Sequence, residues 1–215
     1  MKVRGMRSLR DITPKAIHPD RWALGLTGNP GSGKSTAARM MEALGAQVVD
    51  ADAVGHQLLE ADSPVYDALA EEFGSEAASP EGRIDRKALG SIVFRSPERL
   101  RRLNEIVHPV LVERLKEAMR RFRSSQQGGV LVVDAALIYE WGIQDWFDAV
   151  LVVTAPKEKR EQRLLASGRF TAEDFRRRDA AQLAEADKAR QADVVFHNDA
   201  DLEDLRRQIE QFIKN

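Results

Sequence analysis

The chain has 215 residues, 43% of them apolar, which is enough for one hydrophobic core and leaves room for an inserted lobe. Its 33 lysines and arginines nearly balance its 34 aspartates and glutamates, so no overall charge favours a nucleic-acid or membrane partner. No apolar run approaches the length of a membrane span. The absence of cysteine excludes disulfides and thiolate metal sites, and it fits the reducing, cytoplasmic compartment that we expect.

Residues 1–20 are predicted to be a disordered or loosely docked extension of the folded domain. The first ten residues, MKVRGMRSLR, carry four basic side chains and no acidic one, but no apolar segment of a secretory signal follows. An organellar transit peptide is the alternative, and Asp11 and the nearby prolines disfavour it.

Short apolar runs alternate with helical patterns along most of the chain. Runs of this kind are typical of strands buried on both faces of a parallel sheet wrapped by helices. The sequence therefore predicts an α/β fold with a five-stranded parallel sheet. The predicted strands are 23–27, 47–50, 130–134, 149–154 and 193–197.

A long stretch without a strand pattern separates the second and third predicted strands. Apolar residues recur there at helical spacing, which indicates an inserted helical lobe at about 55–127 between two core segments, 21–54 and 128–215. Ser96-Pro97 predicts a new helix with proline at its first position. The amphipathic pattern of 202–213 predicts a closing helix.

The stretch GNPGSGKS at 28–35 matches G-x-x-x-x-G-K-[ST], the phosphate-binding loop, and it follows a strand and precedes a helix as that loop requires. Glycines allow backbone N–H groups to converge on phosphate oxygens, and the helix N-terminus adds a positive dipole end. We expect Lys34 to reach the β- and γ-phosphates, Ser35 to hold Mg²⁺ and Thr36 to bind the α-phosphate of a nucleoside triphosphate. The predicted nucleotide-binding residues of this loop are Asn29, Pro30, Gly31, Ser32, Gly33, Lys34, Ser35 and Thr36.

Two carboxylates, Asp50 and Asp52, follow the second predicted strand, which we take to be the neighbour of the strand before the loop. Residues two apart on an extended chain face one side, so both could point at the phosphate site. One could act as a general base toward a hydroxyl, or the pair could organise Mg²⁺ through water. The alternative is that they are helix caps or turn acids. No N-K-x-D motif is present, which disfavours a GTPase.

The segment GLTGNPGSGKS, with LGAQVVDAD after it, resembles the amino-terminal signature of dephospho-CoA kinases. The resemblance continues through GRIDRKAL (82–89), IVFRSPERLRRLNEIVHPVL (92–111) and VVDAALIYE (132–140). It continues with Arg163, SGR (167–169), Gln182, Lys188 and ADVVFHN (192–198), and altogether it covers residues 23 to about 212. Ala136 and Ala200 depart from it, since the family usually has proline and glycine there.

The resemblance implies ATP-dependent, Mg²⁺-assisted phosphorylation of the ribose 3′-hydroxyl of dephospho-CoA by a P-loop kinase core with a helical CoA-binding lobe and a small lid at about 166–180. It implies that Asp52 is the base and that Asp50 supports it or the metal, although the two roles could be exchanged. Arg86 and His108 would contact the acceptor, with a merely packed histidine as the alternative for His108.

The same resemblance assigns the remaining site residues. Arg169 is preferred over the run 176–178 as the arginine that closes over the transferring phosphoryl group. Arg163 would be a second phosphate ligand, and Asn198 would lie beside the adenine unless it is an ordinary turn residue. Leu137 and Tyr139 would wall the acceptor pocket.

Two other functions stay open at this stage. One is a P-loop kinase for another small hydroxyl metabolite, which the size and the sequence of the helical insertion disfavour. The other is a nucleotide-dependent regulatory or RNA-binding module, which the near-zero net charge and an aromatic content of only 6% disfavour.

Overall fold

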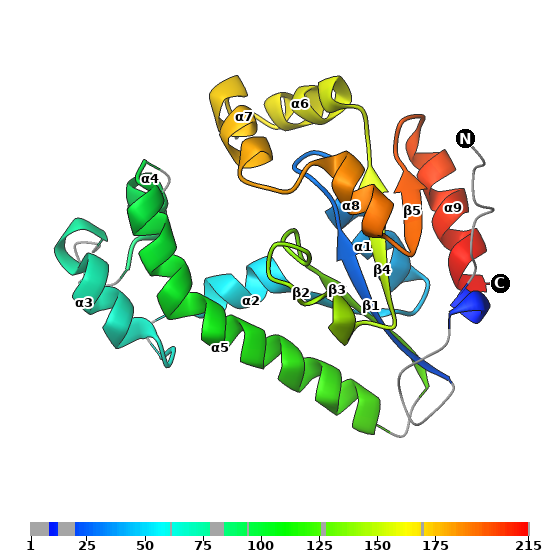
Figure 1. Cartoon of the computed structure of the whole chain (residues 1–215), viewed down its shortest axis with the longest axis horizontal. Coiled ribbons are helices and arrows are strands. Elements are labelled where there is room, and N and C mark those ends of the chain that lie inside the picture. The colour runs from blue at the N-terminus through cyan, green and yellow to red at the C-terminus, as the bar shows by residue number, and fades with distance from the viewer. Residues whose placement is uncertain are drawn as a thin grey trace. The chain divides into compact units, whose positions relative to one another are not determined.

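The structure is a computed structural model that describes residues 9–12, 20–60, 62–77, 84–93, 95–125, 128–168 and 170–214. They form two compact units (Figure 1). The first unit comprises Met1–Val49 and Arg121–Asn215, and the second comprises Asp50–Arg120.

A five-stranded parallel sheet, in the order β2-β3-β1-β4-β5, is the centre of the first unit. This confirms the predicted sheet, with strand ends within two residues of those expected. The expected neighbour of the loop's strand was wrong, because β3 lies between β1 and β2. The strands are β1 Arg21–Thr27, β2 Gln47–Asp50, β3 Gly129–Asp134, β4 Ala149–Thr154 and β5 Val194–His197.

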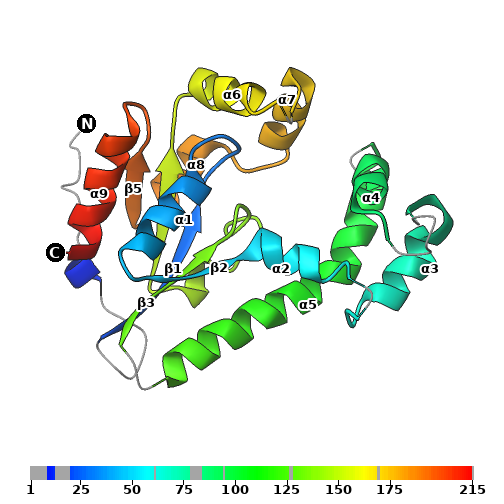
Figure 2. The ribbon, with the colours of Figure 1, turned by 180° about the vertical axis from the view of Figure 1, so that it is seen from behind.

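Helices cover both faces of this sheet. Helices α1 and α9 pack together on one face, and α8 contacts β4 on the other (Figures 1 and 2). No helix in the described part of the chain is long and apolar enough to cross a membrane. The helices of the first unit are η1 Leu9–Asp11, α1 Lys34–Ala43, η2 Gln144–Trp146, α6 Lys157–Ala166, α7 Ala172–Ala180, α8 Glu185–Gln191 and α9 Leu202–Lys214.

The core of the first unit lies between the sheet and the α1–α9 pair. Leu24 and Leu26 of β1 are fully buried in it, and Phe196 of β5 meets Phe212 of α9 edge to face, with 5.7 Å between ring centroids. The predicted closing helix is thus confirmed as a helix that completes the core. Leu9 of η1 is also buried in this cluster, so part of the predicted extension belongs to the folded unit.

The second unit is helical in its described residues, apart from an isolated bridge at Ile84. On α5, Arg102 donates to Glu72 of α3 at 2.9 Å, which ties the two helices together. As predicted, α5 begins at Pro97, and it continues to Ser124 in the first unit. The helices are α2 Ala51–Gln57, α3 Tyr66–Ala77, α4 Arg86–Val93 and α5 Pro97–Ser124.

Replacing Phe212 by alanine should destabilise the protein by about 3–5 kcal/mol, because the change leaves a cavity in the core and removes the ring contact with Phe196. Urea denaturation followed by circular dichroism measures this difference. Leu202→Ala is the matched control on the same helix: Leu202 is 55% exposed, so the change should stay within about 0.5 kcal/mol. Equal losses for the two variants would contradict the placement of the core.

Candidate functional site

The phosphate-binding motif forms a tight turn between β1 and α1. The N–H of Ser32 donates to the carbonyl oxygen of Asn29 at 3.0 Å, and helix α1 begins at Lys34, as predicted. Gly33 caps α1 without a side-chain hydrogen bond. The first N–H groups of a helix have no partner within it, so the first turn of α1 presents donors to an anion.

Two glycines of this turn have backbone conformations that side chains rarely adopt. Gly31 has φ = 80° and Gly33 has φ = 101°. A Cβ on Gly31 would lie 2.3 Å from the carbonyl oxygen of Arg160, and one on Gly33 would lie 2.2 Å from Nδ2 of Asn198. The loop is therefore packed against two side-chain-bearing segments, and both glycines are required by space as well as by backbone angle.

Two side chains outside the loop donate hydrogen bonds to its backbone carbonyl groups. Asn198, which is buried after β5, donates from Nδ2 to the carbonyl oxygen of Ser32 at 2.8 Å. Arg163 of α6 donates to the carbonyl oxygens of Asn198 at 2.9 Å and of Gly31 at 3.4 Å. Both residues therefore support the loop. That Arg163 also binds phosphate, and that Asn198 lies beside the adenine, stay predictions.

Lys34 forms an ion pair with Asp134, the last residue of β3. The Asp134 side chain is 3% exposed and that of Lys34 is 12% exposed, so the pair is nearly dehydrated. Sequence reasoning missed Asp134 as a site residue, although the sequence held a signal: a carboxylate directly after an apolar strand of a parallel sheet, where ligands bind. Asp134 ends β3, the strand that lies beside β1 in the sheet.

The turn after β3 is held by a second buried cation. The fully buried Lys188 of α8 donates from Nζ to the carbonyl oxygen of Ala136 at 2.8 Å and pairs with Glu140 at 3.0 Å. Burial lowers the pKa of Lys188, and the bond to Glu140 opposes that shift. Thr27, at the end of β1, also donates to the Ala136 carbonyl, at 2.9 Å. The turn is thereby fixed beside the phosphate loop.

Leu137 and Tyr139, the predicted walls of the acceptor pocket, lie in this same turn and are half-buried. The Tyr139 hydroxyl is buried without a hydrogen-bond partner in the structure. Its burial raises the pKa of Tyr139, and the charge of Asp193 adds to that effect, so the phenol is neutral at pH 7.

Asp50 and Asp52 belong to the second unit, where they differ in their surroundings. Oδ1 of Asp50 accepts the N–H groups of Asp52 at 2.8 Å and of Ala53 at 3.2 Å, so Asp50 is the N-cap of α2. Asp52 stands exposed in the first turn of that helix. The alternative of a helix cap thus holds for Asp50, and its predicted roles at the metal or acceptor stay predictions.

The other predicted acceptor residues also lie in the second unit. Arg86 begins α4, and its side chain is outside what the structure describes. His108 lies on α5, where burial lowers the pKa of the imidazole and favours its neutral form at pH 7. A neutral His108 is suited to hydrogen bonding rather than to charge neutralisation.

Arg169, the predicted closing arginine, lies outside the described residues. Gly168 before it has φ = 68°, and Thr171 after it caps α7 through a capping box with Asp174. Two arginines of the run 176–178 have partners of their own: Arg177 donates to Asp174 at 2.5 Å, and Arg178 stacks over the ring of Phe170 at 4.7 Å.

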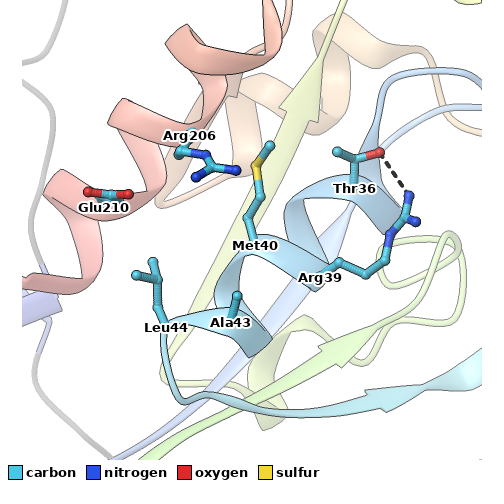
Figure 3. Close-up of a pocket in the computed structure, with 7 residues that line it drawn as sticks. All are labelled: Thr36, Arg39, Met40, Ala43, Leu44, Arg206 and Glu210. Carbon is cyan, nitrogen blue, oxygen red and sulfur yellow. Dashed lines mark hydrogen bonds between the residues drawn. The ribbon is translucent and has the colours of Figure 1, made fainter.

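A groove of about 480 Å³ runs between α1 and α9 (Figure 3). Thr36 is the residue of the predicted site that lines it, and Arg39 donates to the Thr36 hydroxyl at 3.4 Å. The groove therefore touches the end of the phosphate loop without containing it. Its lining residues are Thr36, Arg39, Met40, Ala43, Leu44, Arg206 and Glu210.

The family model for dephospho-CoA kinase matches residues 22–204, which span the loop, both units and the last strand. The chain belongs to the dephospho-CoA kinase family. It is 38% identical over 182 residues to the dephospho-CoA kinase of Thermobifida fusca, covering 85% of this chain and 90% of that one. It is also 38% identical over 186 residues to that of Aquifex aeolicus, covering 86% and 93%.

Solved structures agree with this assignment. A crystal structure of a Thermus thermophilus protein superimposes with a TM-score of 0.74 at 33% identity, covering 88% of this chain and 95% of that one. The dephospho-CoA kinase of Campylobacter jejuni follows with a TM-score of 0.65 at 25% identity, covering 88% and 94%. The predicted family and the P-loop kinase fold are confirmed, and this member of the dephospho-CoA kinase family is an enzyme of the kinase class.

Two glycines with positive φ, Gly33 inside the loop and Gly45 outside it, allow a matched test of the loop. Gly33→Ala should weaken ATP binding at least about tenfold, because its Cβ would collide with Asn198. Gly45→Ala is the control: Gly45 has φ = 97° with nothing within 4 Å, so it should cost stability of about 1–2 kcal/mol and leave ATP binding unchanged. Titration calorimetry measures the Kd for ATP of both variants. Equal Kd values for Gly33→Ala and Gly45→Ala would contradict the role of the loop.

Proposed function

We propose that this protein transfers the γ-phosphoryl group of ATP to the ribose 3′-hydroxyl of dephospho-CoA, giving CoA and ADP in the last step of CoA synthesis. The observation that carries the proposal is the phosphate loop, with its anion-facing helix start and dehydrated Lys34–Asp134 pair, in a chain of the dephospho-CoA kinase family. We assign the reaction to the cytoplasm, which fits the cysteine-free composition.

The residues around the loop fit a nucleotide with Mg²⁺. Magnesium is commonly held by one or two carboxylates together with substrate phosphates and water. Asp134 offers a buried carboxylate at the carboxyl end of β3, and Ser35 offers a hydroxyl in the first turn of α1. When bound, Mg²⁺ would neutralise phosphate charge. Lys34 would then exchange part of its contact with Asp134 for the phosphate oxygens, where it stabilises the charge of the transition state.

Asp52 is the better of the two candidate bases. Oδ1 of Asp50 already accepts two N–H groups of α2, which holds this carboxylate against the start of the helix. Asp52 is exposed in the first turn of the same helix and accepts no such bond from the helix start. We therefore assign to Asp52 the removal of the proton from the 3′-hydroxyl, and to Asp50 the positioning of the helix that carries it.

The remaining assignments follow the family pattern. Arg169 would close over the transferring phosphoryl group as part of a small lid at about 166–180, which contains Gly168 and α7. His108 and Arg86 would bind the acceptor, and the half-buried Tyr139 would shape its pocket together with Leu137.

A coupled assay for ADP with ATP, Mg²⁺ and one of three acceptors tests the proposed function. Dephospho-CoA should be turned over at least about a hundredfold faster than adenosine or AMP, and phosphorus NMR of the product should show a 3′-phosphate. Activity on AMP or adenosine alone would identify a different small-molecule kinase. No turnover with any acceptor would contradict a kinase function altogether.

Asp52→Asn should lower kcat by about 10²–10⁴-fold, which is the usual contribution of general base catalysis, while the Kd for dephospho-CoA stays within a few-fold of the parent value. Asp50→Asn is the matched control. Asparagine also caps helices, so this variant should keep most of its kcat. Steady-state kinetics and calorimetry with dephospho-CoA separate the two constants. If Asp50→Asn lost more kcat than Asp52→Asn, the two roles would have to be exchanged.

Lys34→Ala should reduce kcat/KM for ATP by about ten-thousandfold, equivalent to about 5 kcal/mol, because the charge on the transferring phosphoryl group loses its partner. The exposed Lys214 on α9 provides the control, and Lys214→Ala should leave kcat/KM unchanged. Initial rates at limiting ATP measure both variants. A near-normal rate for Lys34→Ala would rule out the phosphate-loop assignment.

A further inference from the structure

A buried cation, Arg160 of α6, lies directly behind the phosphate loop. The Arg160 side chain is 5% exposed, and it pairs with Asp179 at 2.6 Å and with Glu185 at 3.3 Å. Asp179 is in the last turn of α7 and Glu185 begins α8. A single guanidinium therefore joins three helices of the first unit.

The same guanidinium reaches the loop. Nη1 of Arg160 donates to the carbonyl oxygen of Pro30 at 3.2 Å while it also bonds Asp179. The backbone carbonyl of Arg160 fills the space beside Gly31 that a Cβ would need. The position of α6 thus fixes two consecutive residues of the loop, one through a hydrogen bond and one through close packing.

Asn29 makes a parallel connection from the loop to the chain beyond α7. Its Nδ2 donates to the carbonyl oxygen of Leu183 at 3.1 Å, and Asn29 also lies close enough to Asp179 to lower the pKa of that carboxyl. Asp179 therefore accepts a hydrogen bond from Arg160 of α6 and interacts with Asn29 of the loop. The end of α7 thus contacts both α6 and the loop.

The pKa values of Asp179 and Glu185 agree with their contacts to Arg160. Burial alone would raise the pKa of Asp179, but the bond and charge of Arg160, together with Lys157 and Asn29, outweigh it and hold that pKa below its usual value. Burial raises the pKa of Glu185, with Arg160 opposing the shift. Asp179 is thus the ionised partner of Arg160 at neutral pH.

We propose that Arg160 and Asp179 are positioning residues for phosphoryl transfer: their buried ion pair sets the shape of the phosphate loop from the side of α7. The loop holds its ATP-binding shape only while α7 keeps Asp179 beside Arg160 and Asn29. The inference rests on the proposed function, because it concerns ATP binding by the same loop. It adds to that function a dependence of the loop on α7, the helix of the proposed lid.

A purely structural ion pair would behave differently from a positioning pair. Replacing a buried ion pair by apolar residues of similar volume is often neutral or stabilising, whereas removing one partner leaves an uncompensated charge. The triple variant Arg160→Met/Asp179→Leu/Glu185→Gln removes the charge of Arg160 together with those of both carboxylate partners, so it should keep the parent Tm. It cannot restore the hydrogen bond from Arg160 to Pro30 or the interaction of Asn29 with Asp179, so only ATP binding should be weakened.

The experiment compares Tm, by calorimetric scanning, with the Kd for ATP, by titration calorimetry without any acceptor. For the triple variant we expect a Tm within about 3 °C of the parent and a Kd for ATP raised at least about tenfold, with the KM for dephospho-CoA within about twofold. A parent-like Kd would overturn the proposal. Since ATP binding is measured without an acceptor, the result stands even if the acceptor proves not to be dephospho-CoA.

Arg160→Lys decides the question if the triple variant does not fold. Lysine keeps the positive charge beside Asp179 but lacks the planar fork that reaches Pro30 and the carboxylates together. We expect it to fold and to bind ATP at least about fivefold more weakly; parent-like binding would overturn the proposal. Asp187→Asn is the control for charge removal, because Asp187 pairs with Arg190 within α8, and it should change neither quantity.

Discussion

The active site depends on one constraint: the carbonyl groups of the phosphate loop must find hydrogen-bond donors on the side away from the ligand. A loop that turns its N–H groups toward an anion turns its carbonyl groups the other way, where water has little access and unpaired oxygens are costly. Here Asn198, Arg163 and Arg160 supply those donors to Ser32 and its neighbours. The residues behind the loop are therefore as necessary to its shape as its glycines are.

The order of the strands decides which carboxylate meets this loop. After β1 the chain crosses to the outer strand β2 and only later returns to fill the place beside β1 with β3, whereas β4 and β5 extend the sheet on the other side. The loop thus stands where the sheet changes direction, the position at which open parallel sheets bind ligands. Because β3 is the inner strand, Asp134 pairs with Lys34 there.

The features that could be predicted from the sequence are those with local signals. Apolar runs marked the five strands, and the spacing of Gly28, Gly33 and Lys34 marked the loop. The family resemblance supplied the function and its candidate residues. The strand order was mispredicted because adjacency in sequence does not fix adjacency in a parallel sheet. Because of that error, Asp134 was not identified as a site residue. The contact of Arg160 with Pro30 joins residues 130 positions apart, and no local pattern announces it.

Arg163 and Asn198 illustrate a second limit. Their positions in the family pattern indicate that they belong to the nucleotide site, but a pattern does not say whether a side chain faces the ligand or the backbone that holds the ligand. In the structure both use their donors on carbonyl groups, and Asn198 is almost completely buried while doing so. Burial and partner geometry decide between these roles, and both are properties of the folded chain.

The buried cations around the loop have a consequence for stability as well as for binding. Lys34, Arg160 and Lys188 are each dehydrated, and each has a carboxylate partner that limits the cost: Asp134, Asp179 and Glu140. The charge of Lys34 still opposes that of Lys188, since it lowers the pKa of Lys188. A bound triphosphate adds negative charge to this cluster and binds the folded state alone. Nucleotide binding should therefore stabilise the fold by mass action as well as organise the site.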